Sequence, residues 1–207
     1  MNRSQLMPQP VSGAHEELAA VRLVSVAEML RMIPRAEQGG TDQERGLAAA
    51  NAFYEHGVGR AAAEHVSSLR DAGHTAQMKP GFWERIMESL ESSPMPEQEW
   101  EPLLEILGDE ILGKLTGVSD SSMRRYRNGE RKTPDEVAGR LHFTALIVAD
   151  LLGSYNAFGV RRWFGRPRAQ LHGSSPLEML EPEWAPEDSG PQAIRELAAA
   201  LLAPLAS

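Results

Sequence analysis

Cysteine does not occur among the 207 residues of this chain, and several other features are scarce. Without a thiol the protein forms no disulfide, thiolate metal site, iron–sulfur cluster or cysteine nucleophile, which is typical of cytoplasmic proteins. Aromatic residues make up only 6% of the chain, and no uninterrupted apolar run reaches about 18 residues, so no transmembrane helix is predicted. The N-terminal stretch also lacks the pattern of a secretion signal, so we expect a cytoplasmic protein with no membrane partner.

Acidic residues outnumber basic ones, but the excess of acidic residues is uneven along the chain. The total of 21 basic and 29 acidic residues corresponds to a net charge of −8. Residues 1–100 carry 9 basic and 14 acidic side chains, residues 101–170 carry 11 and 9, and residues 171–207 carry 1 and 6. The total argues against a nucleic-acid partner, whereas the basic middle segment is compatible with one.

The apolar pattern predicts an all-α protein. Apolar residues recur at helical spacing, and no strand-like alternation is sustained. A Ser or Thr followed three residues later by Glu or Gln is typical of a helix start, and this box begins at Ser25, Thr41, Ser175 and Ser189. A further start is indicated by Thr133 and Pro134.

Changes in composition divide the chain into four parts. We expect a flexible tail over residues 1–15 and a helical N-terminal region of unknown role over residues 16–98. A Pro-containing linker over residues 92–96 leads to a helix-turn-helix over residues 99–155 and a small helical module over residues 156–207.

The basic middle segment has the features of a helix-turn-helix. Gly113 presents a small surface where a second helix can cross closely, and Gly117 permits the sharp turn. Val118 then fills the angle between the helices, and Ser119 is expected to cap a second helix that ends near Asn128.

The second helix of this unit is expected to have one buried and one exposed face. Met123 and Tyr126 lie three residues apart and should both point inward. The exposed residues are of types that bind base edges and phosphates, and we predict these DNA-binding residues: Ser121, Arg124, Arg125, Arg127, Asn128, Arg131 and Lys132. The alternative is the solvated face of an ordinary helical hairpin.

With Tyr126-Arg127-Asn128-Gly129 at the end of its second helix, the unit resembles the Xre/Cro-type helix-turn-helix. The resemblance implies binding to operator double-stranded DNA, and helix-turn-helix proteins usually bind as dimers, so we expect a homodimer. Two acidic residues, Asp120 and Glu130, depart from an otherwise basic surface.

The C-terminal module contains an aromatic pair, a Pro-containing turn, a Ser-Pro-Leu start and a closing helix. The residues of this pattern are Trp163, Phe164, Pro167, Leu171, Gly173, Ser175, Pro176, Leu177, Leu180, Ile194 and Leu197. In this order they resemble the Xre/MbcA/ParS-like toxin-binding domain of type II antitoxins. The resemblance implies binding to a toxin, typically a RES-domain enzyme that consumes NAD, by covering its active-site entrance.

Candidate toxin contacts cluster near the turn of this module. They are Arg161, Arg162, Trp163, Arg166, Arg168 and Leu171. Alternatively, Trp163 and Leu171 belong to the core of the module, and the arginines form a solvated helix end.

Taken together, the two resemblances predict a cytoplasmic antitoxin that neutralises its toxin and represses its own operon, with no cofactor and no enzymatic activity. No catalytic constellation is recognisable, and the nine-residue spacing of His56, His65 and His74 does not converge on a metal. One alternative is a stand-alone helix-turn-helix regulator whose N-terminal half is a sensor. Another is an adaptor that uses the helix-turn-helix surface for protein contact.

Overall fold

The structure, a computed structural model, describes residues 12–35, 41–59, 80–180 and 183–202. Within these ranges the regular elements are all helical and no strand occurs, which confirms the predicted all-α class. The helices are α1 (Ser12–Met29), α2 (Asp42–Glu55), α4 (Phe82–Glu91), α5 (Pro96–Leu107), α6 (Asp109–Thr116), α7 (Asp120–Arg127), α8 (Asp135–Leu152), α9 (Ala157–Gly165), η4 (Ala169–Leu171), α10 (Pro176–Met179) and α11 (Ser189–Ala199).

Two of the predicted helix starts form complete capping boxes. At the start of α2 the Thr41 side chain accepts a hydrogen bond from the Glu44 N–H, and the Glu44 carboxylate accepts one from the Thr41 N–H. Ser175 and Glu178 make the same reciprocal pair at the start of α10. The local sequence alone predicts these capping boxes, because both hydrogen-bonding partners lie within one helical turn.

The other starts differ from the prediction. Ser25 lies inside α1, where its hydroxyl donates to the Val21 carbonyl 3.0 Å away, because α1 already begins at Ser12 within the expected tail. Thr133 does not cap α8 but is buried and accepts a hydrogen bond from the Trp100 indole at 3.0 Å. Ser189 is the first residue of α11 rather than its cap. At Thr133, a partner 33 residues earlier in the chain therefore overrides the local signal.

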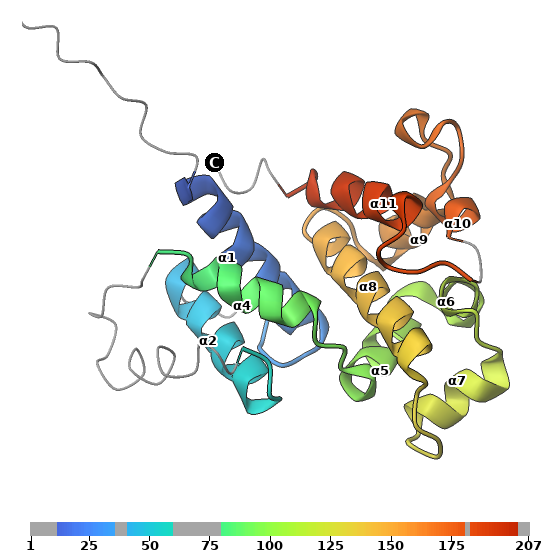
Figure 1. Cartoon of the computed structure of the whole chain (residues 1–207), viewed down its shortest axis with the longest axis horizontal. Coiled ribbons are helices and arrows are strands. Elements are labelled where there is room, and N and C mark those ends of the chain that lie inside the picture. Colours follow the sequence, from blue (N-terminus) through green and yellow to red (C-terminus); the bar gives the residue numbers. More distant parts are fainter. Residues whose placement is uncertain (1–11, 36–40, 60–79, 181–182, 203–207) are drawn as a thin grey trace, which may run out of the picture.

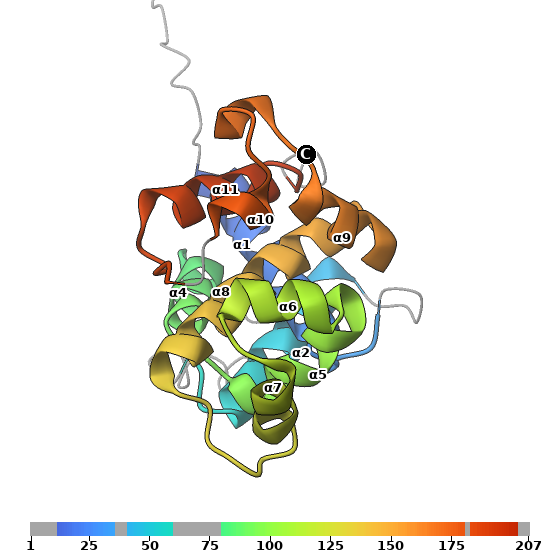
Figure 2. The ribbon, with the colours of Figure 1, turned by 90° about the vertical axis from the view of Figure 1, so that its right-hand side faces the viewer.

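Helix α8 is the central element of the fold. It lies between the N-terminal helices α1, α2 and α4 and the C-terminal helices α9, α10 and α11 (Figure 1). Seen from the side, α6 and α7 lie in front of α8, with α9 to α11 above them (Figure 2). The helix is apolar around most of its circumference and is buried over most of its length, as expected of a helix covered on several sides.

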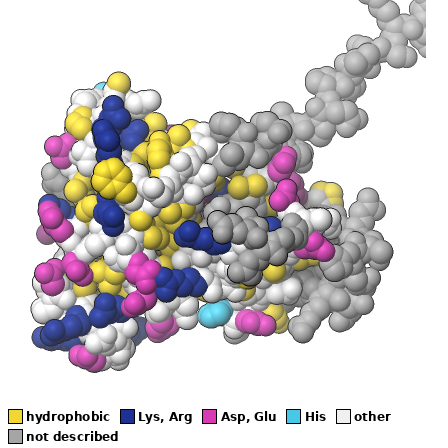
Figure 3. All heavy atoms as spheres, turned by 180° about the vertical axis from the view of Figure 1, so that it is seen from behind, with side chains coloured by type: hydrophobic (Ala, Val, Ile, Leu, Met, Phe, Trp, Pro, Cys, Tyr) yellow, Lys and Arg dark blue, Asp and Glu magenta, His cyan; other side chains and the backbone are white. Residues whose placement is uncertain are grey.

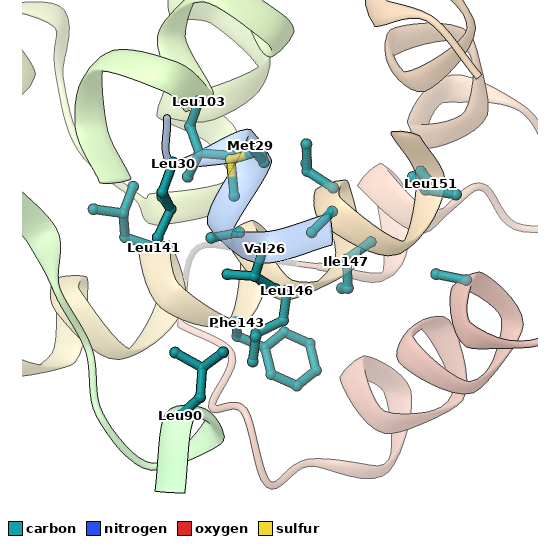
Figure 4. Close-up of a cluster of buried hydrophobic side chains, with 14 of the residues drawn as sticks. Val26, Met29, Leu30, Leu90, Leu103, Leu141, Phe143, Leu146, Ile147 and Leu151 are labelled. Atoms are coloured by element: carbon teal, nitrogen blue, oxygen red, sulfur yellow. The ribbon is translucent and has the colours of Figure 1, made fainter. Parts of the chain in front are cut away.

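One hydrophobic core joins the parts that composition separated. Val26 of α1 and Leu30, which directly follows that helix, point toward Leu146 and Leu141 of α8, and Leu103 of α5 closes the same cluster (Figure 4). The cluster continues into α9, α10 and α11. Within the predicted linker, residues 92–95 are therefore a short connection between α4 and α5 in one core, and Met95 is itself buried.

A buried ion pair fixes α1 to α8. The Arg22 guanidinium donates through Nε and Nη2 to the two carboxylate oxygens of Asp150, at 3.0 and 3.1 Å. Glu91 of α4 accepts from Arg22 and from Arg195 of α11, so the network connects four helices. Burial raises the pKa of Asp150 above its usual value, an effect that the nearby Arg22 charge only partly offsets.

A second buried pair connects α4, α5 and α8. The His142 ring contacts a carboxylate oxygen of Glu99 through Nδ1, and its Nε2 lies 2.8 Å from the Leu90 carbonyl oxygen. The N-terminal region is thereby joined to the helix-turn-helix segment by hydrogen bonds as well as by apolar packing.

Among the described residues, no single helix combines the length and apolarity needed to cross a membrane. Helices α8 and α9 satisfy the criterion only as a pair, and they meet at a bend of 118°.

Candidate functional site

The predicted helix-turn-helix residues lie in α6, a three-residue turn and α7. A Cβ atom on Gly113 would lie only 3.1 Å from the Val118 carbonyl oxygen, so the small residue does permit a close approach. Gly117 adopts the left-handed conformation with φ of 71°, which favours glycine. Met123 and Tyr126 are both buried, as their spacing predicted.

Ser119 is placed differently from its predicted role. It occupies the N-cap position of α7, but its side chain accepts no hydrogen bond from the helix backbone. Its hydroxyl oxygen instead lies 3.3 Å from the hydroxyl oxygens of Ser121 and Ser122. The Ser119 carbonyl oxygen accepts from the Ser122 N–H at 2.9 Å, so within the described residues the Asp120 and Ser121 N–H groups are the ones in the first turn of α7 that can meet water or a phosphate.

All seven predicted DNA-binding residues are exposed on or just after α7. Arg124 and Arg125 make no side-chain hydrogen bond or ion pair with any described residue, so both guanidinium groups are available to a ligand. Four others have partners within the chain: Arg127 lies 3.7 Å from Glu101, Asn128 donates to Glu130 at 2.9 Å, Lys132 lies 3.9 Å from Asp135, and Arg131 stacks over Tyr126.

These partners change what the surface can do. Asn128 gives one amide N–H to the Glu130 carboxylate, which leaves its second N–H and its Oδ1 atom for a base edge. The ion pairs of Arg127 and Lys132 are solvent-exposed and cost little to exchange for a phosphate. The two unpartnered arginines are therefore the strongest candidates for an anionic ligand.

The candidate toxin contacts separate into buried and accessible residues. Trp163 and Leu171 are only 3% and 2% exposed, so they belong to the core, as the alternative interpretation held. Arg161 is half-buried and donates to the Ile106 carbonyl oxygen at 2.9 Å, which fixes α9 to the end of α5. These three residues therefore serve mainly to position the module.

The remaining arginines form an unneutralised basic group. Arg162 and Arg166 are exposed, and the Arg168 guanidinium stacks over the Trp163 ring at 4.5 Å. No described carboxylate pairs with any of the three. Burial lowers the pKa of Arg168 below its usual value; the nearby Tyr155 partly offsets this effect, and the neighbouring Arg166 charge adds a smaller lowering.

Two aromatic residues that the sequence interpretation missed lie beside these arginines. Phe158 is 66% exposed and Tyr155 is 39% exposed. A signal for Phe158 existed in the sequence: it lies two residues before the buried Val160, and two residues on a helix turn the side chain to nearly the opposite face. An aromatic residue off the apolar face is a candidate for partner contact.

Of the three evenly spaced histidines, the structure describes only His56. His56 is exposed, and its Nδ1 lies 2.9 Å from the Ala52 carbonyl oxygen, while His65 and His74 lie outside the described residues. In the described part of the chain, no three His, Cys, Asp or Glu side chains gather closely enough to hold a metal ion.

Comparison with known proteins found no matching family model, no matching curated protein and no matching solved structure. The helix-turn-helix pattern, the pattern of the C-terminal module and the surfaces that carry them are therefore the basis for a proposed function.

Proposed function

We propose that this protein is a cytoplasmic antitoxin and autorepressor. In this proposal α6 and α7 bind operator double-stranded DNA as part of a homodimer, and the module from α9 to α11 binds and silences a toxin. The observation that carries the DNA-binding half is the pair of exposed, unpartnered guanidinium groups of Arg124 and Arg125 on the second helix of the turn. Arginine in that position is suited to guanine edges and to phosphates.

The toxin-binding half is supported by the composition of the α9 surface. Exposed aromatic and arginine side chains gather there, and these residue types dominate binding energy in protein interfaces. The resemblance of the module to the toxin-binding domain of type II antitoxins points to a RES-domain enzyme as the partner. The residues that would contact it are Arg162, Arg166 and Arg168.

DNA binding can be tested by fluorescence anisotropy with a duplex from the region upstream of the gene. We expect tight binding that weakens steeply with salt, because each phosphate contact releases counterions. Arg124→Ala should weaken binding by about 1–3 kcal/mol, and adding Arg125→Ala should weaken it further and reduce the salt slope by about 1 per lost phosphate contact.

The matched control is Arg85→Ala, which removes the same charge from an exposed position on α4, on the opposite side of the molecule from α7 (Figure 1). We expect this variant to bind the duplex like the wild-type chain. Equal losses in Arg85→Ala and Arg124→Ala, or binding that is insensitive to salt, would contradict an interface centred on α7.

A stand-alone regulator is the second candidate, and one observation favours it. A hollow of about 450 Å³ lies between α1 and α2, with Ala20, Val21, Val24 and Trp83 among its apolar lining and an acidic rim that includes Glu17. Such a hollow could serve a sensor of apolar or cationic ligands. The antitoxin proposal predicts a stable complex with the product of the adjacent gene, whereas the sensor proposal predicts none.

A further inference from the structure

The surface around the start of α9 combines exposed aromatic side chains with arginines. On the face of the molecule opposite to Figure 1, basic side chains flank hydrophobic ones over the C-terminal module (upper left in Figure 3). Phe158 is the most exposed large hydrophobic residue in the described part of the chain. The Phe158 ring therefore leaves apolar surface in contact with water, and a partner protein could bury that surface.

Next to Phe158 is a hollow of about 290 Å³ that we call the arginine pocket. Its lining residues are Tyr155, Gly159, Arg162, Trp163, Arg166 and Arg168. Gly159 brings the helix close to Tyr155, since a Cβ atom there would lie 3.0 Å from the Tyr155 Cβ. The pocket thus has an aromatic wall, three guanidinium groups and no carboxylate.

The charge in the arginine pocket has no counterpart within the described chain. Other partly buried arginines are all satisfied: Arg22 binds Asp150, Arg140 donates to the Trp184 carbonyl and Arg195 binds Glu91. In contrast, the Nε atom of Arg168 is buried without any hydrogen-bond partner. Three neighbouring guanidinium groups without an acid favour an anion supplied from outside the molecule.

We propose that the arginine pocket receives an aspartate or glutamate side chain of a partner protein, while Phe158 inserts into an apolar hollow of the same partner. This inference rests on the proposed function and assigns the chemistry of its partner surface. A carboxylate is preferred because its two oxygens match the fork of an arginine, and the adjacent exposed aromatic requires an apolar surface that a free phosphate lacks. Aromatic and arginine anchors placed side by side are typical of interface hot spots.

The pocket can be tested on the purified chain without any partner. The probe is the peptide acetyl-Glu-Leu-Glu-amide, titrated into the isotope-labelled protein while the Gly159 amide and Trp163 indole NMR signals are followed. We expect saturable shifts with this peptide and none with acetyl-Gln-Leu-Gln-amide. Arg166→Ala should weaken binding by about tenfold or more, because a charge-assisted hydrogen bond is lost.

The matched control is Arg85→Ala, which removes the same charge from an exposed position on α4 and should leave the titration unchanged. Absence of saturable shifts, or equal shifts with the glutamine peptide, would overturn the assignment of a carboxylate site. Tighter binding of inorganic phosphate than of the acidic peptide would overturn the assignment to a partner protein.

A second arm uses the product of the adjacent gene. If the wild-type chain forms a complex with it, Phe158→Ala and Arg166→Ala should each weaken that complex by about tenfold or more, and both side chains are exposed enough to leave the melting temperature unchanged. Undiminished binding by both variants would overturn this inference and leave the proposed function intact. Failure of the wild-type chain to bind contradicts the proposed function, whereas the peptide titration still decides the nature of the pocket.

Discussion

Replacing Arg22 with methionine should show how strongly the N-terminal region is held to the rest of the fold. The substitution keeps most of the apolar stem but removes two hydrogen bonds, 3.0 and 3.1 Å long, to a carboxylate that is only 1% exposed. It leaves Asp150 buried beside Arg195 as the remaining nearby cation. The expected result is a large loss of stability at neutral pH.

The magnitude follows from two independent arguments. Two unit charges about 4 Å apart interact by about 4 kcal/mol at the effective dielectric of a protein surface. Breaking a buried pair by removing one partner costs about 3–5 kcal/mol in comparable cases. For a chain of this length, a loss of 3–5 kcal/mol lowers the melting temperature by about 6–20 °C.

The loss should depend on pH in a defined direction. Burial already raises the pKa of Asp150, and removal of Arg22 should raise it further. Because the pKa is then higher in the folded state than in the unfolded state, protonation of Asp150 favours folding. The stability contributed by the protonated form is full below the unfolded pKa and is lost as pH rises through the folded pKa. The penalty in Arg22→Met should therefore shrink as the solution is acidified.

The assay is thermal unfolding followed by circular dichroism at neutral and acidic pH. Lys114→Met is the control, since it removes an ion pair of the same charge type that is largely exposed, and its melting temperature should not change measurably. The double variant Arg22→Met/Asp150→Leu should recover most of the loss, because no charge is left unpaired by the change. Equal melting temperatures for Arg22→Met and Lys114→Met at neutral pH would refute the reasoning.

Two further predictions concern local geometry. Gly113→Val should destabilise the protein by about 1–3 kcal/mol in urea unfolding, because its Cβ would press on the Val118 carbonyl oxygen. Gly139→Ala on α8 should stabilise the protein by about 0.4–1 kcal/mol, because its Cβ would make an ordinary 4.0 Å contact with the Pro186 ring. Similar effects of the two changes would contradict the close approach at Gly113. Hydrogen bonds from Ser175 lower the pKa of Glu178, so this carboxylate supports folding above its unfolded pKa and loses that effect as pH falls through the folded one. In Ser175→Ala the NMR titration midpoint of Glu178 should move up, and an unchanged midpoint would count against the capping box.

Local signals in the sequence predicted the features whose partners lie close together along the chain. The capping box of Thr41 and Glu44 spans one turn, and the shared buried face of Met123 and Tyr126 follows from a spacing of three residues. The exposure of Arg124 on the opposite face follows from the same geometry.

Features that depend on distant partners could not be predicted in this way. Thr133 looks like a helix cap until Trp100, 33 residues earlier, is seen to donate to its hydroxyl. The stretch 92–96 has the composition of a linker, yet Met95 is buried because the core on either side of it is continuous. Phe158 is a different case, because its position off the apolar face of α9 follows from its two-residue spacing to the buried Val160 and was open to prediction from the sequence.

The central claim, neutralisation of a toxin through the C-terminal module, is tested most directly by growth of cells that express the product of the adjacent gene from an inducible promoter. We expect the wild-type chain and the Arg124→Ala/Arg125→Ala variant to relieve the growth arrest. The Phe158→Ala/Arg166→Ala variant should relieve it only poorly. Arrest that persists with the wild-type chain, or relief that is undiminished in Phe158→Ala/Arg166→Ala, would contradict the central claim.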